Sequence, residues 1–133
     1  MPVGTARLLH TQQIHYFRKR VNYNDAGIAA GVFVGTIPAG AMLVYAAARI
    51  NVAFNAVTTN VLQMGTTAGG GEILANAVVL AGAAGFKTAT SGTAFAATFA
   101  TDTDIFVSYT QTGAVATAGQ GDLMVAYCPN NDQ

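Results

Sequence analysis

The clearest pattern in the chain is an alternation of apolar and polar positions between residues 42 and 55. Every even position up to 54 is apolar, whereas the odd positions include Tyr45, Arg49, Asn51 and Asn55. Successive side chains of a strand point to opposite faces, so this period of two predicts a half-buried β-strand, or two strands joined by a β-bulge. The predicted apolar face consists of Met42, Val44, Ala46, Ala48, Ile50, Val52 and Phe54.

Shorter apolar segments predict further strands, most of them bounded by turns that contain glycine or proline. These segments lie at residues 14–23, 27–37, 60–65, 94–99, 104–111 and 123–127. One short helix is expected over residues 72–80, where Leu74, Ala75, Val78 and Val79 recur at helical spacing. About seven or eight short strands with such turns predict an all-β fold, an antiparallel sandwich or barrel, and a two-layer sandwich is the simplest architecture for one domain.

The N-terminal segment differs from the rest because neither face of its strand is purely apolar. That property is typical of an edge strand, or of an arm that lies on a partner. We therefore expect residues 1–25 to form an extended N-terminal arm or edge strand and residues 26–133 to form the sandwich, as one structural unit. An extended arm can add a strand to the sheet edge of a neighbouring molecule.

Charged residues are scarce along the whole chain. They make up 9% of the residues, against about 25% in an ordinary soluble domain, while apolar residues make up 52% and the formal net charge is 0. A net charge near zero favours association. We therefore expect neighbouring subunits to cover much of the surface. The neutral balance gives no indication of general nucleic-acid binding, so no specific nucleic acid is expected as a partner.

The residues that usually carry chemistry do not form a recognisable site. His10 and His15 would point to opposite faces of a strand, and the single Cys128 has no partner at a local spacing and excludes an intrachain disulfide. Asp102 and Asp104 would share a strand face and are expected in a solvated turn, although two such carboxylates can also share a cation. The glycine clusters lack the spacing of phosphate-binding loops. We expect no enzyme activity, no catalytic residues, no metal site and no cofactor.

A membrane span is also not expected. Residues 26–48 carry no charge and are numerous enough to cross a bilayer. Five glycine and proline positions interrupt them, however, and residues 37–40 read as a turn in the middle of the segment.

The only basic run is Arg18-Lys19-Arg20, which follows the isolated Arg7. One interpretation is electrostatic docking onto an acidic partner or nucleic acid. The other is a solvated edge strand whose charges prevent edge-to-edge aggregation. Both interpretations stay open on the sequence alone.

Four segments resemble the small head proteins of tailed bacteriophages, the cement or decoration proteins on the outside of the capsid. They are residues 35–43 (GTIPAGAML), 50–55 (INVAFN), 60–66 (NVLQMGT) and 117–127 (TAGQGDLMVAY). The resemblance implies an antiparallel jelly-roll-like β-sandwich that forms a homodimer or homotrimer. It also implies a structural protein of the virion exterior, assembled in the host cytoplasm, that binds the major capsid protein and bridges neighbouring capsid subunits. Under this hypothesis Arg7, Arg18, Lys19 and Arg20 contact the capsid.

Two other functions compete with this one. The chain could be a tail or fibre component whose loops at residues 66–71 and 112–121 bind a receptor or carbohydrate. A carbohydrate-binding module is a related alternative, but sugar sites favour exposed aromatic residues and the chain contains no Trp.

Overall fold

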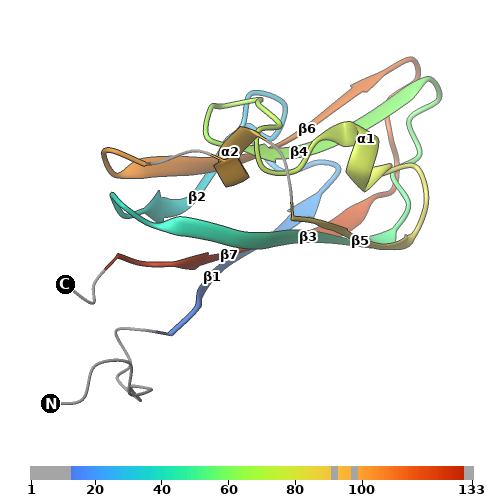
Figure 1. Cartoon of the computed structure of the whole chain (residues 1–133). Coiled ribbons are helices and arrows are strands. Elements are labelled where there is room, and N and C mark those ends of the chain that lie inside the picture. Colours follow the sequence, from blue (N-terminus) through green and yellow to red (C-terminus); the bar gives the residue numbers. More distant parts are fainter. Residues whose placement is uncertain (1–12, 91–92, 97–98, 131–133) are drawn as a thin grey trace, which may run out of the picture.

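The computed structural model describes residues 13–90, 93–96 and 99–130, which form two β-sheets packed face to face (Figure 1). Along the chain the elements are β1 (His15–Asn22), β2 (Val32–Ile37), β3 (Met42–Val52), β4 (Thr59–Gly65), α1 (Asn76–Val79), β5 (Gly85–Ala89), α2 (Thr93–Ala96), β6 (Thr103–Thr112) and β7 (Gln120–Cys128). The expected all-β sandwich is therefore confirmed.

All strand pairs are antiparallel, and each strand lies in the opposite sheet from the strand before it. The four-stranded sheet has the order β1-β7-β3-β5, and the three-stranded sheet has the order β2-β6-β4. This alternation between layers is the connectivity of a jelly roll, which ordinarily has eight strands. An eighth strand would pair with the free edge of β4, where the described chain makes only an isolated bridge between Met64 and Leu74.

The core lies between the inner faces of the two sheets. Leu123 and Val125 of β7 face Leu62 and Met64 of β4, and all four side chains are fully buried. The rings of Phe54 and Tyr109 pack with their centroids 4.4 Å apart, near the end of the sandwich where β4 begins. Burial of this apolar surface supplies the main driving force for the fold.

The strand with the clearest alternation, β3, is continuous and contains two register shifts, where the sequence analysis allowed for one β-bulge and did not place it. They lie between Leu43 and Tyr45 and between Ile50 and Val52. As a result Leu43 is buried, whereas Met42 and Val52 are 61% and 47% exposed. The predicted apolar face is thus correct for the middle of the strand and wrong at these two ends, because each bulge reverses the direction of the following side chains.

Two other predicted elements are shorter than expected. The segment 27–31 forms turns, in which the N–H groups of Ala30 and Gly31 donate to the carbonyl of Gly27, so β2 begins only at Val32. The helix expected at residues 72–80 is one turn, because Leu74 bonds to the backbone of Met64 instead.

One prediction of element type was wrong, and one strand was not predicted at all. Residues 93–96 form the helical turn α2, although a strand was expected over residues 94–99. Residues 85–89 form β5, an edge strand that no alternating pattern indicates because its side chains are mostly exposed.

The first strand, β1, is part of the sandwich and forms one edge of the four-stranded sheet. It pairs with β7 along its whole length, from His15 opposite Tyr127 to Asn22 opposite Gln120. Residues 1–12, which include Arg7 and His10, lie outside the described part of the chain. None of the described helices has the length and apolar character that crossing a membrane requires.

Candidate functional site

The outer face of the four-stranded sheet carries an ordered set of side chains that do not contribute to the core. They alternate with buried residues such as Leu123 and Val125, so they point away from the three-stranded sheet. The strand register arranges them in three rows. The rows are Tyr16, Ala126 and Tyr45; then Arg18, Met124, Ala47 and Thr88; then Arg20, Asp122, Arg49 and Phe86.

The third row contains a cluster of charged groups around one carboxylate. Arg20 donates from Nε to Oδ1 of Asp122 at 2.9 Å and from Nη2 to Oδ2 at 3.1 Å, a two-pronged contact. Nη2 of Arg18 lies 3.2 Å from Oδ2, and Nδ2 of Asn51 donates to the same oxygen at 3.0 Å. The carboxylate is thus held by three side chains from two different strands.

These contacts change the proton affinities of Asp122 and Arg20. The hydrogen bonds from Arg20 hold the pKa of Asp122 well below its ordinary value, and Asn51 and Arg18 act in the same direction, although burial opposes them. The same hydrogen bond raises the pKa of Arg20. Asp122 therefore stays ionised at any physiological pH.

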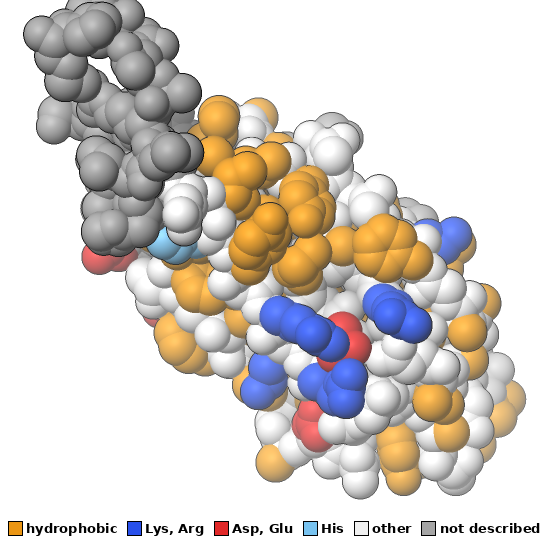
Figure 2. Space-filling view, turned by 90° about the horizontal axis from the view of Figure 1, so that it is seen from below, with side chains coloured by type: hydrophobic (Ala, Val, Ile, Leu, Met, Phe, Trp, Pro, Cys, Tyr) orange, Lys and Arg blue, Asp and Glu red, His pale blue; other side chains and the backbone are white. Residues whose placement is uncertain are grey.

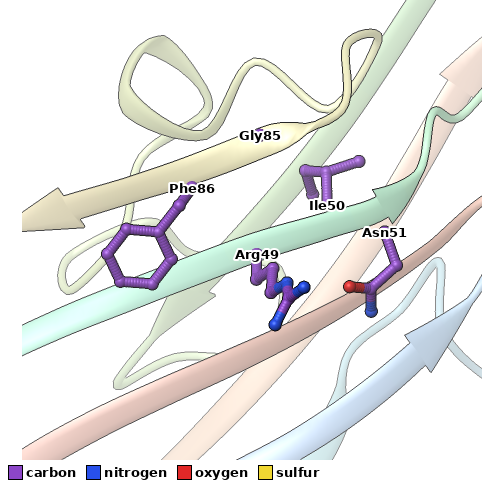
Figure 3. Close-up of a pocket in the computed structure, with 5 residues that line it drawn as sticks. All are labelled: Arg49, Ile50, Asn51, Gly85 and Phe86. Atoms are coloured by element: carbon purple, nitrogen blue, oxygen red, sulfur yellow. The ribbon is translucent and has the colours of Figure 1, made fainter.

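Arg49 is the third guanidinium group in this row, and it is exposed. Among the residues that the structure describes, it has no hydrogen-bond or ion-pair partner. Figure 3 shows Arg49 and Asn51 on one side of β3 and Ile50 on the other, with the ring of Phe86 on the same side as Arg49. Two guanidinium groups therefore hold the carboxylate, and a third, that of Arg49, lies in the same row with no partner among the described residues.

Two shallow hollows meet at Arg49 and Phe86. One is the pocket of Figure 3, between the ends of β3 and β5. The other runs across the sheet toward β1 and is lined by Arg18, Ala47, Arg49, Phe86, Asp122 and Met124. Both hollows are open to the surface, so they fit side chains of another molecule better than an enclosed small ligand.

An apolar area lies directly beside the charged cluster. Figure 2 looks onto this face and shows orange side chains gathered next to blue cations around one red carboxylate. Tyr16 and Tyr45 flank the small, fully buried Ala126, and their hydroxyl groups interact. Burial, together with this contact, raises the pKa of Tyr45. Tyr16 is 54% exposed and Phe86 63% exposed, so aromatic surface is available at both ends of the face.

The predicted basic run does not act as one cluster. Arg18 and Arg20 lie on the outer face, whereas Lys19 has the opposite parity and points the other way. Arg7 is among the residues that are not described. Sequence reasoning did not identify Arg49 and Asp122, because they are far from the run in sequence and only the strand register brings them to it. The signal available was Arg49 itself, a lone cation within an apolar strand.

The other candidate residues have structural roles. The ring of His15 stacks on Tyr127 with centroids 5.6 Å apart. Asp102 accepts a hydrogen bond from the backbone N–H of Ala39, and Asp104 accepts one from the hydroxyl of Thr36. Cys128 is half-buried. Within the described ranges no group of three or more His, Cys, Asp or Glu side chains could hold a metal ion.

Comparison with known proteins identifies the fold. No protein-family model matches the sequence, and no curated protein matches it. Among solved structures, the chain is similar to a chain of the Cyanophage Pam1 capsid asymmetric unit, with a TM-score of 0.60 and 20% sequence identity, over 97% of both chains. It is also similar to a chain of the capsid of Ralstonia phage GP4, with a TM-score of 0.56 and 18% identity, over 98% of this chain and 91% of that one. At these identities the chain shares the fold of those two capsid components.

Proposed function

We propose that this chain is a structural subunit of a bacteriophage virion and has no enzyme activity. The observation that carries the proposal is the fold shared over nearly full length with chains from two phage capsids. Coverage of 97% in both directions means that the similarity extends to the whole architecture rather than to one common motif. Among the described residues, no group of three or more His, Cys, Asp or Glu side chains could hold a metal ion.

Within that role, we propose a cement or decoration subunit that binds the outer surface of the major capsid shell and bridges neighbouring subunits. Three features support it. The chain carries only 9% charged residues, which favours a surface covered by neighbours. Its sequence segments resemble phage cement proteins, and one sheet leaves a charged and aromatic face uncovered. Many copies of a weakly binding clamp can stabilise a shell, because each engaged contact raises the effective concentration of the next.

Quantitative mass spectrometry of purified virions from the source phage tests this proposal. The number of copies is measured against the major capsid protein, in full heads, in emptied heads and in separated tails. We expect a copy number comparable to that of the capsid protein, retained on emptied heads. A few copies that separate with the tails would instead assign the chain to the tail or fibre, and absence from the virion would overturn the structural role.

A further inference from the structure

We propose that the outer face of the four-stranded sheet is the surface that contacts the shell, and that it recognises an acidic protein surface through the free guanidinium group of Arg49. This inference rests on the proposed function and specifies which side of the molecule faces the capsid and what chemistry it meets. It differs from docking by the basic run alone, because Arg49 and Phe86 come from β3 and β5.

The first argument is the distribution of charge over the fold. All the described cations lie in strands of the four-stranded sheet, namely Arg18, Lys19, Arg20, Arg49 and Lys87. Of the described acids, Asp122 alone lies there, whereas Asp25, Glu72, Asp102 and Asp104 lie elsewhere. Lys19 and Lys87 have the opposite parity, so the outer face itself carries Arg18, Arg20 and Arg49 against Asp122, which leaves two excess positive charges on that face. A partner that complements this face is acidic.

The second argument is the state of the individual cations. Asp122 already binds Arg18 and Arg20, which fixes their guanidinium groups in place. Arg49, in the same row, makes no such bond within the described chain. A carboxylate from a partner that approached Arg49 would meet a donor pair in a preorganised positive surrounding. It would also lie beside the exposed ring of Phe86.

The third argument distinguishes a protein partner from nucleic acid. Binding to a phosphate backbone depends mainly on cations and hydrogen-bond donors, whereas this face also places the apolar side chains of Met124 and Phe86, with Tyr16 and Tyr45, within the same three rows as the arginines. Aromatic residues, Met and Arg together are the composition enriched at protein–protein interfaces. The combination therefore fits a protein surface with carboxylates next to apolar side chains.

A second copy of this chain is a poorer occupant. Two copies related by a two-fold axis would place the same positive rows against each other, which costs energy. Two of the four described acids outside the sheet are already held by several hydrogen bonds within the chain, which leaves the exposed Asp102 and Asp104 for a head-to-tail contact. Asp25 accepts from the N–H of Asn22 at 2.8 Å, and Glu72 accepts from Thr66 and Thr67.

Binding of the full-length protein to shells that lack it tests the assignment, with co-sedimentation over a salt series as the readout. In R49E, we expect the dissociation constant to rise about tenfold or more, since a charge contact is replaced by repulsion. K87E is the matched control. It changes the charge of the same sheet equally, but Lys87 has the opposite parity on β5 and we expect binding close to wild type.

A second pair of variants tests the apolar part without changing charge. F86S removes an aromatic ring that is 63% exposed on the proposed face, and F33S removes one that is 53% exposed on the other sheet. We expect weaker binding of F86S and unchanged binding of F33S. Circular dichroism of all four variants shows whether they keep the fold.

The possible results separate this inference from the proposed function. If R49E and F86S bind shells as tightly as the wild-type protein does, the assigned face is overturned and the cement role still stands. Equal weakening by R49E and K87E would also overturn it, since only bulk charge would matter. Wild-type protein that fails to bind shells at all would overturn the cement role itself. Analytical ultracentrifugation compares the self-association of wild type and R49E. If the wild type self-associates and R49E does not, the outer face binds a second copy of this chain, and the proposal of an acidic capsid surface is refuted.

Discussion

The two sheets have similar inner faces and different outer faces. Inside, both present fully buried aliphatic side chains to a common core. Outside, the three-stranded sheet pairs its polar groups with each other, as in the 2.7 Å contact between the hydroxyls of Thr59 and Thr112. Ser108 points outward from its centre yet is only 2% exposed, so other segments of the chain cover that centre.

The outer face of the four-stranded sheet, by contrast, is not covered by the described chain. It keeps Arg49, which has no partner among the residues that the structure describes, and two largely exposed aromatic residues, Tyr16 and Phe86. Three of the five described Lys and Arg residues lie on this face, whereas solubility would be served better by a scattered distribution of charge. Exposed aromatic rings occur on both sheets, Phe33 on one and Phe86 on the other, so the two outer faces differ chiefly in the arginines of the four-stranded sheet.

The largest effect is expected from the part that the two sheets share. L123A and L62A each remove a fully buried leucine side chain, one from each sheet. We expect each to lower the free energy of unfolding by about 3 kcal/mol, because each leaves a cavity in the same core. Urea unfolding at neutral pH measures both values. A small loss in only one sheet would show that the inner faces are not equivalent.

The outer faces are compared by replacing one carboxylate on each. D122N removes the charge that holds Arg18 and Arg20 together, so we expect a loss of about 2 kcal/mol in the free energy of unfolding. D104N is the matched control on the other sheet, where an exposed carboxylate accepts one bond from Thr36. There we expect a change of less than about 0.5 kcal/mol. Equal losses in the two variants would contradict the special role of the Asp122 cluster.

A pH series sharpens the same contrast. The pKa of Asp122 is lower in the folded chain than in the unfolded chain, so the unfolded chain takes up the proton more readily as the pH falls. The stabilising contribution is thus complete above about pH 4 and decreases at lower pH. Burial would raise the pKa of Glu72, but hydrogen bonds from Thr67 and Thr66 outweigh it and lower this pKa as well. The stabilising contribution of the Glu72 carboxylate is therefore also lost as the pH falls.

Comparison of variants isolates the contribution of Asp122 to that pH dependence. Thermal unfolding of wild type and D122N between pH 6 and pH 2.5 gives the difference in stability at each pH. We expect the stabilities of wild type and D122N to converge as the pH falls below about 4. Low pH removes the stabilising contribution of the Asp122 charge from the wild type, and D122N lacks that charge at every pH. A constant difference over the whole range would show that the carboxylate charge does not stabilise the fold.

The smallest effect on stability is expected at Arg49. R49Q removes a charge that has no partner among the described side chains, so we expect a change within about 0.5 kcal/mol. Chemical denaturation measures it. A decrease in the free energy of unfolding as large as that of D122N would mean that Arg49 stabilises the fold, which would contradict a role limited to binding.

The sequence predicted the fold class well because the strands of the core follow simple rules. The alternation of β3 and the apolar positions of β6 and β7 identified the inner faces of both sheets. A bulge in β3 was among the expectations, but its position and the second bulge could not be predicted, since an extra residue changes parity without changing composition. The edge strand β5 was missed because a strand exposed on both faces needs no apolar period.

The candidate site was only half predicted, for a different reason. Arg18 and Arg20 stand out as a basic run, and their two-residue spacing places them on one face of a strand. Their carboxylate partner is at position 122, and the free arginine is at position 49. Pairing between strands far apart in sequence decides that arrangement, and one sequence contains no information on register beyond its apolar pattern.

The pairing of β1 with β7 has a mechanical consequence. His15 and Tyr127 are opposite each other, so the described chain enters β1 and leaves β7 at the same end of the sheet. A force pulling those two ends apart would peel the strands from each other one backbone pair at a time. A force spread over the outer face would load all the pairs of the sheet together. The sandwich is therefore much weaker against tension at its ends than against tension across the face that we assign to the shell.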